Sequence, residues 1–290
     1  MAQQLKNYLS LIKFSHTIFA LPFALDGYVL GSLSAQHFSG RLLLLVILCM
    51  VFARSAAMAF NRYLDRDIDG KNPRTQVREI PAGVISARSA FWFVIINSLA
   101  FWLVTWFINP LCFALAPVAL LVILGYSYTK RFTAWCHFVL GLGLALAPVG
   151  AFLAVAGHFS LISILYGVVV LLWVAGFDII YALQDRDFDE GLGLQSIPVA
   201  LGKAGALRLS NLLHFFCALV LIAAVYLQGQ DYNAFTGLHY LAAGIFLVLL
   251  FYQHTLVKPD DLRRVNLAFF TTNGVASLIF GSLVILDVFF

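Results

Sequence analysis

Charged residues are scarce in this sequence. Asp, Glu, Lys and Arg make up 11% of its 290 residues, whereas 62% of the residues are hydrophobic. A soluble domain carries about a quarter charged residues, so the composition argues against a soluble globular protein. The polar–apolar alternation of an outer-membrane barrel is also missing. Apolar runs near the roughly 20 residues needed to cross a bilayer recur along the chain, and backbone groups in lipid must be satisfied within each run. We therefore predict an all-α, polytopic membrane protein.

Cysteine is scarce as well. The four cysteines lie in apolar stretches without CxxC spacing, which favours packed thiols over a metal or redox site. No small-residue cleavage signal follows the first apolar run, so we interpret that run as a spanning helix and not as a removed signal peptide. The net charge of +4 comes mostly from loop residues and gives no case for binding nucleic acid.

The apolar runs predict nine spanning helices, separated by turn-forming residues such as Asn109-Pro110. Lys and Arg are nearly absent from one side of this arrangement. If the N-terminus is inside, Arg41 is the only Lys or Arg in the outer connections. This bias predicts a chain with its N-terminus inside and its C-terminus outside. The predicted spans are approximately 14–34, 41–64, 90–108, 111–129, 135–156, 160–183, 207–227, 237–257 and 267–288.

The acidic residues gather at two places. Asp65-Arg66-Asp67-Ile68-Asp69 recurs 120 residues later as Asp185-Arg186-Asp187-Phe188-Asp189. Each copy follows an even-numbered predicted helix on the predicted cytoplasmic side. The match predicts one integral-membrane domain, 1–290, with two pseudo-repeated halves of about 1–133 and 134–290 that share a site.

Each acidic motif repeats at helical intervals and so predicts a row of oxygen ligands on one helix face. Because like charges stacked in this way repel, the rows need a bound cation. With no His or Cys nearby, the ligands favour a hard ion such as Mg²⁺, which typically joins one or two carboxylates to a substrate phosphate. We expect two facing rows to hold a pair of ions on a diphosphate. The rows are Asn61, Asp65 and Asp69, and Asp178, Tyr181, Asp185 and Asp189.

Basic residues accompany the acidic motifs. Arginine forks suit phosphate oxygens, and metal together with Arg and Lys can stabilise a leaving diphosphate. The alternative is a solvated, positively charged loop, which we favour for Arg88, Lys258, Arg263 and Arg264. The candidate phosphate ligands are Lys71, Arg74, Arg78, Tyr126 and Lys130.

Arg54 is a separate signal inside the second predicted span. It precedes Asn61 by seven residues and Asp65 by eleven, so it points into the same predicted cavity one level deeper. An intramembrane arginine needs a partner. From the residues alone, that partner is either an Asp of the bundle or the carboxylate of a bound acid.

Three further polar residues carry no motif. His16 lies near the cytoplasmic end of the first predicted span and could touch the site, although we favour a packed or interfacial histidine. Asp26 and Asp287 lie in or near spans, and the sequence suggests no role for either.

At these motifs the chain resembles the UbiA superfamily of intramembrane prenyltransferases, and it is similar to the branch of 4-hydroxybenzoate polyprenyltransferases. The resemblance covers nearly the whole chain. It implies nine transmembrane helices around a central cavity that opens laterally to lipid. The motifs that carry it are Asn61-x-x-x-Asp65-x-x-x-Asp69 followed by Arg74-Thr75-x-x-Arg78, Tyr126-Ser127-Tyr128-Thr129-Lys130-Arg131, and Asp178-x-x-Tyr181-x-x-x-Asp185-x-x-x-Asp189.

The resemblance also implies a reaction. Mg²⁺ held by the acidic motifs binds a polyprenyl diphosphate, the C–O bond ionises to an allylic carbocation, and an electron-rich aromatic ring attacks it. Arg54 matches a family arginine associated with the aromatic acid. The implied metal ligands are Asn61, Asp65, Asp69, Asp185 and Asp189, of which the four aspartates are catalytic. The implied substrate contacts are Arg74, Arg78, Tyr126 and Lys130, with Lys71, Asp178 and Tyr181 beside them.

Two departures from the family pattern concern the acceptor. Arg62 stands where Asp is frequent, and Gln195-Ser196-Ile197 stands where the hydroxybenzoate enzymes often have Lys-Ser-Thr. The acceptor is therefore 4-hydroxybenzoate, as in ubiquinone synthesis, or a dihydroxynaphthoate, as in menaquinone synthesis. We expect the enzyme in a bacterial inner membrane, in contact with lipid, with its active-site loops facing the cytoplasm.

The alternative from a different class is an ion-coupled secondary transporter, because inverted halves and intramembrane Asp residues also suit ion coupling. Transporter sites lie near the membrane midplane, whereas the predicted carboxylates lie at one interface beside arginines. The position of the motifs therefore favours the prenyltransferase.

Overall fold

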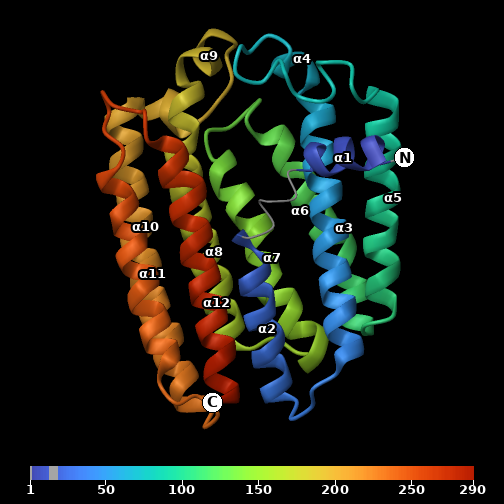
Figure 1. Ribbon diagram of the computed structural model, residues 1–290, viewed down its shortest axis with the longest axis vertical. Coiled ribbons are helices and arrows are strands. Elements are labelled where there is room, and N and C mark those ends of the chain that lie inside the picture. The colour runs from blue at the N-terminus through green and yellow to red at the C-terminus, as the bar shows by residue number, and fades with distance from the viewer. Residues whose placement is uncertain (1, 13–18) are drawn as a thin grey trace.

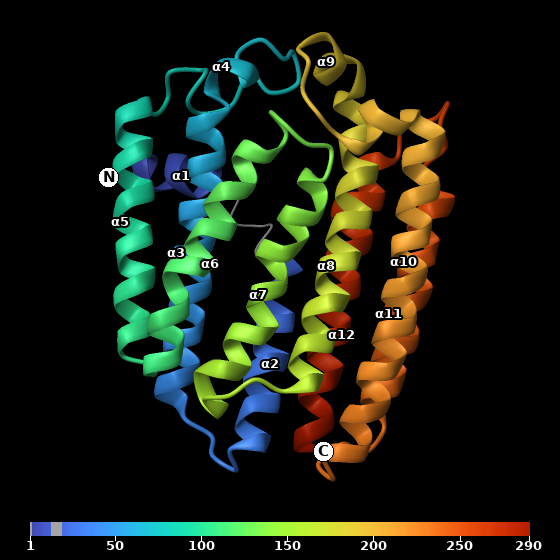
Figure 2. The ribbon, with the colours of Figure 1, turned by 180° about the vertical axis from the view of Figure 1, so that it is seen from behind.

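The computed structural model describes residues 2–12 and 19–290, with side chains from residue 6 onward. Within these residues the chain is helical and has no extended strand; one isolated β-bridge joins Lys258 and Asp261. The long helices run side by side along the long axis of the molecule (Figures 1 and 2). The prediction of an all-α fold is confirmed.

The helices follow one another as an antiparallel bundle (Figure 1). A 3₁₀ turn at Leu183–Asp185 links α8 to α9, and a π-helical segment at Leu267–Thr272 leads into α12. The α-helices are α1 Ala2–Leu11, α2 Leu21–Ser34, α3 Gly40–Leu64, α4 Arg66–Asp69, α5 Ala87–Trp106, α6 Pro110–Thr129, α7 Cys136–Ala156, α8 Leu161–Ala182, α9 Arg186–Gly191, α10 Ile197–Asp231, α11 Leu238–Thr255 and α12 Asn273–Phe289.

Eight helical segments of the described chain are long and apolar enough to cross a membrane. They correspond to the last eight predicted spans. The first predicted span, 14–34, lies partly outside the described residues, and its described part is α2. The seventh span was predicted too short, because α10 begins at Ile197 and continues through a break at Gly202, whose φ of 67° is left-handed. Nine spans with the N-terminus inside remain a prediction.

Local sequence explains where several helices begin and end. The side chains of Ser39, Ser86 and Asn109 each accept a hydrogen bond from a backbone N–H of the first turn of α3, α5 and α6. Pro110 then occupies the first position of α6, where its missing N–H costs little. Gly157 ends α7 with a left-handed φ of 71°.

Small residues let the central helices approach closely. A Cβ on Gly27 of α2 would lie 2.2 Å from the Pro148 carbonyl oxygen of α7. A Cβ on Gly141 of α7 would lie 2.5 Å from the Leu171 carbonyl oxygen of α8. Such contacts are the usual way in which helices pack in lipid, where the hydrophobic effect between helices is absent.

The largest buried cluster of the described residues has aromatic side chains from α2, α8, α11 and α12 at its centre. Phe23 stacks on Phe280 with ring centroids 5.3 Å apart, and Trp173 meets Phe246 edge-on at 5.3 Å. Large apolar side chains of the outer helices, such as Ile96 of α5, are exposed. An apolar exterior on this scale suits contact with lipid.

The two isolated acids of the spans have different environments. Asp287 of α12 is fully buried, and its carboxylate accepts hydrogen bonds from the backbone N–H groups of Thr236, Gly237 and His239. These bonds cap the N-terminus of α11. The carboxylate also pairs with His239 Nδ1 at 2.5 Å. Asp26 of α2 is 1% exposed, and neither carboxylate oxygen has a hydrogen-bond partner among the described residues. His16 lies outside those residues.

Candidate active site

The two acidic motifs lie at the same end of the bundle, where α4 and α9 face each other (Figures 1 and 2). We call this the motif end. The prediction of uninterrupted helical rows is wrong in detail: α3 ends at Leu64 and α8 at Ala182. The backbone stays coiled across the first break, because Asp65 N–H donates to Asn61 O at 2.9 Å and Asp69 N–H to Asp65 O at 2.7 Å. The bend lets each carboxylate meet a different basic partner, which relieves the repulsion within a straight row.

Asp65 joins the end of α3 to the end of α6. It is 2% exposed and lies between two cations. Lys130 Nζ is 2.6 Å from Oδ2, and Arg131 Nη2 is 2.8 Å from Oδ1. Asn61 Nδ2 donates to Oδ2 at 3.3 Å. Lys130, which was predicted as a phosphate contact, thus pairs with the first motif, and so does Arg131, which the sequence had shown only as part of a motif.

Asp69 anchors the loop that follows the first motif. Arg78 Nη1 lies 2.7 Å from Asp69 Oδ1, and the Thr75 hydroxyl donates to the Asp69 carbonyl at 3.1 Å. The second carboxylate oxygen, Oδ2, is buried without a hydrogen-bond partner among the described residues. The departure from the family pattern, Arg62, is 5% exposed and within electrostatic range of Asp69.

The same loop reaches the second motif. Arg74 forms a two-point contact with Asp185, in which Nε donates to Oδ1 at 2.9 Å and Nη2 pairs with Oδ2. Arg74 Nη1 also donates to the Tyr181 hydroxyl at 2.9 Å. Burial lowers the pKa of Arg74, but the hydrogen bonds to Asp185 and Tyr181 outweigh burial and raise the pKa overall. Arg74 therefore stays cationic and connects the two motifs.

Two predicted residues of this region, Lys71 and Asp189, differ in their burial. Lys71 is exposed, whereas its neighbour Asn72 is buried and donates to Asp185 Oδ1 at 3.2 Å. Asp189 of α9 is partly buried and within electrostatic range of Asp65 and Asp185. Asn72 was missed because its contact spans 113 residues and belongs to no spacing pattern.

Asp178 lies deeper in α8 and pairs with a histidine that the sequence reading missed. His137 Nδ1 is 2.7 Å from Asp178 Oδ2, and the His137 side chain is 3% exposed. The Ile197 N–H approaches the other ring nitrogen, Nε2, at 3.3 Å. The contact joins α7 to α8 over 41 residues, so no local motif could have revealed it.

Arg54 and Tyr126 belong to the same deeper level. Both side chains are partly buried, and Arg54 of α3 is within electrostatic range of Tyr126 of α6. Tyr126 in turn is within electrostatic range of Asp65 and Asp178. The Tyr126 side chain is therefore near the first motif, Arg54 and Asp178.

The candidate metal ligands are oxygen donors, several of which are now paired with basic side chains. No three His, Cys, Asp or Glu side chains of the described chain come together as a preformed site. Cations neutralise Asp65, Asp69 and Asp185 instead. All candidate ligands are oxygen donors, which Mg²⁺ prefers, and Asp69 Oδ2 is a buried oxygen with no hydrogen bond. The donor set fits Mg²⁺ if the basic side chains turn to a phosphate.

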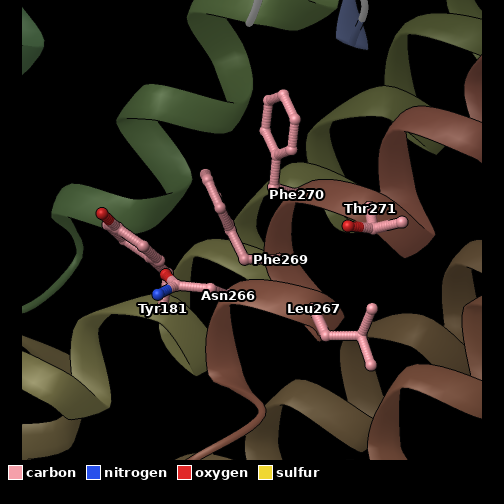
Figure 3. A pocket seen from close by; sticks show the side chains of 6 residues that line it. All are labelled: Tyr181, Asn266, Leu267, Phe269, Phe270 and Thr271. Carbon is pink, nitrogen blue, oxygen red and sulfur yellow. The ribbon is translucent and has the colours of Figure 1, made fainter.

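A cavity of about 440 Å³ lies beside Tyr181, against the π-helical segment. Figure 3 shows Tyr181 beside Phe269, with Phe270 farther from Tyr181. The rings of Tyr181 and Phe269 are 4.1 Å apart. Because Arg74 donates to the Tyr181 hydroxyl, this cavity adjoins the contact between the two motifs.

Residues 20–275 match the model of the UbiA prenyltransferase family. The chain belongs to this family. The match confirms the resemblance seen in the motifs and makes the protein a prenyltransferase-family enzyme; the transporter alternative is set aside.

Individual UbiA proteins extend the comparison. The 4-hydroxybenzoate octaprenyltransferase of Aliivibrio fischeri (strain MJ11) is 32% identical over 279 residues, which cover 93% of this chain and 89% of that protein. The apo structure of a UbiA homolog from Aeropyrum pernix K1 is 33% identical, with a TM-score of 0.83 and coverage of 94% of this chain and 98% of that one. A UbiA homolog from Archaeoglobus fulgidus bound to GPP and Mg²⁺ has a TM-score of 0.75 at 21% identity, covers 98% of this chain and 100% of that one, and shares the fold.

Proposed function

We propose that this enzyme transfers a polyprenyl group from a polyprenyl diphosphate to an aromatic acid, with Mg²⁺ as cofactor. The Arg74–Asp185 contact is the observation that carries the proposal, because it brings the loop of the first motif onto the second. A site built by both motifs brings together enough carboxylates and basic side chains to bind a diphosphate. The cavity beside Tyr181 offers an apolar path for the polyprenyl tail.

The diphosphate layer of the site contains acids and bases in contact. Mg²⁺ would be held by Asn61, Asp65, Asp69, Asp185 and Asp189, where it supplies positive charge for the leaving diphosphate. The related A. fulgidus structure bound to GPP and Mg²⁺ supports this choice of ion. The basic side chains now paired with the carboxylates are of the right kind to exchange those partners for phosphate oxygens, and they are Arg74, Arg78, Lys130 and Arg131.

The acceptor layer lies deeper. Arg54 is seven residues before Asn61, which is about two helical turns. An arginine at this depth suits the carboxylate of an aromatic acid, since a charged group in the membrane interior needs a partner of opposite charge. The acceptor we favour is 4-hydroxybenzoate, as in the curated relatives, with a dihydroxynaphthoate of menaquinone synthesis as the alternative.

An assay of the purified protein with an acceptor panel tests the proposal. With a polyprenyl diphosphate and Mg²⁺, we expect one acid among 4-hydroxybenzoate, the dihydroxynaphthoates and homogentisate to gain the mass of the prenyl group. Product mass identifies both the acceptor and the tail. If no aromatic acid is prenylated while the donor is bound, the proposed acceptor class is wrong.

A further inference from the structure

A pair formed by the buried His137 and the partly buried Asp178 lies deeper in the bundle than the residues proposed to hold diphosphate. Asp178 lies in α8 and precedes Asp185, at the end of the following 3₁₀ turn, by seven residues, which places it roughly 10 Å further along the axis. A ligand of Mg²⁺ must lie about 2.1 Å from the ion. Asp178 is therefore too far from Asp185 to share one ion with it, and its carboxylate has another use.

His137 fixes the orientation of the Asp178 carboxylate. Ile197 is the first residue of α10, and its N–H is one of the donors left free by the helix N-terminus. This N–H points to His137 Nε2 at 3.3 Å, so Nε2 carries a lone pair. The ring proton is then on Nδ1, which donates to Asp178 Oδ2 at 2.7 Å. Contacts from two other helices thus hold Oδ2.

The Asp178 carboxylate remains partly open although His137 is buried. The Asp178 side chain is 23% exposed, against 3% for His137. Tyr126 is within electrostatic range of Asp178 and of Arg54. Arg54 and Asp178 thus both lie near Tyr126, as a cation and an anion at the deeper level of the site.

We propose that Asp178 accepts a hydrogen bond from the ring hydroxyl of the aromatic acceptor, and that His137 is the positioning residue that holds Asp178 for this purpose. The inference rests on the proposed function. With the acceptor carboxylate at Arg54, we expect the ring hydroxyl to reach Asp178, because Tyr126 is within electrostatic range of both residues. A phenol that donates to a carboxylate releases electron density into its ring, which favours attack on an allylic cation. A site built to bind a hydroxyl also rejects an analogue that lacks it.

Two substitutions of His137 distinguish the effect of its hydrogen bond to Asp178 from the effect of its ring volume. His137→Phe keeps a ring but removes the donor, whereas an Asn side chain at this position can place its amide N–H near the site of Nδ1. We expect His137→Phe to raise the acceptor KM about tenfold, the effect of one lost hydrogen bond to a charged group. The donor KM should be unchanged, and His137→Asn should recover most of the loss.

The matched control is a second histidine–aspartate pair of the described residues, which is fully buried. His239 contacts Asp287 at 2.5 Å near the start of α11, far along the chain from the motifs. His239→Phe should lower thermal stability and leave both KM values unchanged. If His137→Phe behaves like His239→Phe, the pair is structural and the proposal is overturned.

A comparison of two acceptors with the unmodified enzyme avoids the risk that a variant does not fold. The preferred hydroxy acid and its O-methyl ether are compared as acceptors. We expect kcat/KM to favour the hydroxy acid by at least about tenfold, and we expect this preference to disappear in Asp178→Leu. Equal use of the two acceptors by the unmodified enzyme overturns the inference, and the proposed prenyl transfer itself would stand.

Discussion

The arginine and carboxylate pairs of the motif end are the residues on which the account depends. Arg74 binds both oxygens of Asp185, and the neighbouring Asn72 adds a third hydrogen bond to the same carboxylate. A planar guanidinium suits this geometry and the geometry of a phosphate, whereas an ammonium can supply only a point charge. The identity of the cation therefore matters as well as its charge.

We predict that Arg74→Lys raises the KM of the prenyl diphosphate about tenfold while the enzyme stays folded, because the lysine keeps the charge but loses the fork. Steady-state kinetics with varied donor measures the effect. Arg263→Lys is the control, since Arg263 also makes a two-point contact, with Asp261, but is exposed in another loop. An unchanged donor KM in Arg74→Lys would show that the fork does not bind the donor.

The two buried acids outside the motifs predict opposite effects of the same substitution. Asp287 accepts hydrogen bonds from Thr236, Gly237 and His239, so Asp287→Leu leaves buried donors without a partner. Asp26 has no such partners among the described residues, and Asp26→Leu removes a buried polar group that is poorly satisfied. We expect a lower midpoint of thermal unfolding for Asp287→Leu and an unchanged or higher midpoint for Asp26→Leu. The reverse order in a detergent melting experiment would contradict these environments.

The residues that the sequence revealed are those that repeat at helical spacing. Asp65, Asp69 and Asp185 could be recognised because their intervals match a helix and because the motif occurs twice. Asn72 and His137 could not, since each contacts a residue far away in the chain, at a distance that only the packed bundle defines. Nothing in the sequence indicated that the Asp287 carboxylate caps the N-terminus of α11.

Close contacts between helices position the side chains of the deeper layer. The α7–α8 crossing brings the backbone at Gly141 against Leu171, and a Cβ at position 141 would meet the Leu171 carbonyl oxygen at 2.5 Å. This crossing also positions His137 of α7 against Asp178 of α8. The spacing of the helices therefore contributes to the geometry of the deeper layer.

We predict that Gly141→Ala lowers the thermal unfolding midpoint by several degrees, because the backbones must separate. Gly150→Ala, in the same helix, is the matched control, since a Cβ there meets nothing within 4 Å. Equal melting temperatures for the two variants would show that the close approach does not limit packing.

Helix ends were harder to predict than helix positions. Eight predicted spans recur as helices of the described chain, but α10 begins at Ile197 and not near 207. The helix includes one left-handed residue, Gly202, and continues beyond it. Tertiary packing of Ile197 and Ala206 in one buried cluster outweighs the local break.

At the scale of the whole molecule, both motifs lie at one end of the bundle, and the charge bias predicts that this end faces the cytoplasm. Single cysteines test the orientation in a variant without native cysteines. We expect Gln76→Cys, in the exposed loop of the motif end, to be protected from an impermeant thiol reagent added outside intact cells. Asp231→Cys, exposed at the far end of α10, should react. The opposite pattern would invert the predicted topology.

The central claim is that the two acidic motifs form one Mg²⁺-dependent diphosphate site. Prenyl transfer by Asp65→Asn, Asp185→Asn and the double variant, measured with and without Mg²⁺, tests it most directly. If the motifs act as a unit, each single variant loses at least about 100-fold in kcat/KM, and the double variant loses little more than either. Chelation of Mg²⁺ should abolish activity in the unmodified enzyme. Full activity in both single variants, or activity that is the same without Mg²⁺, would contradict the claim.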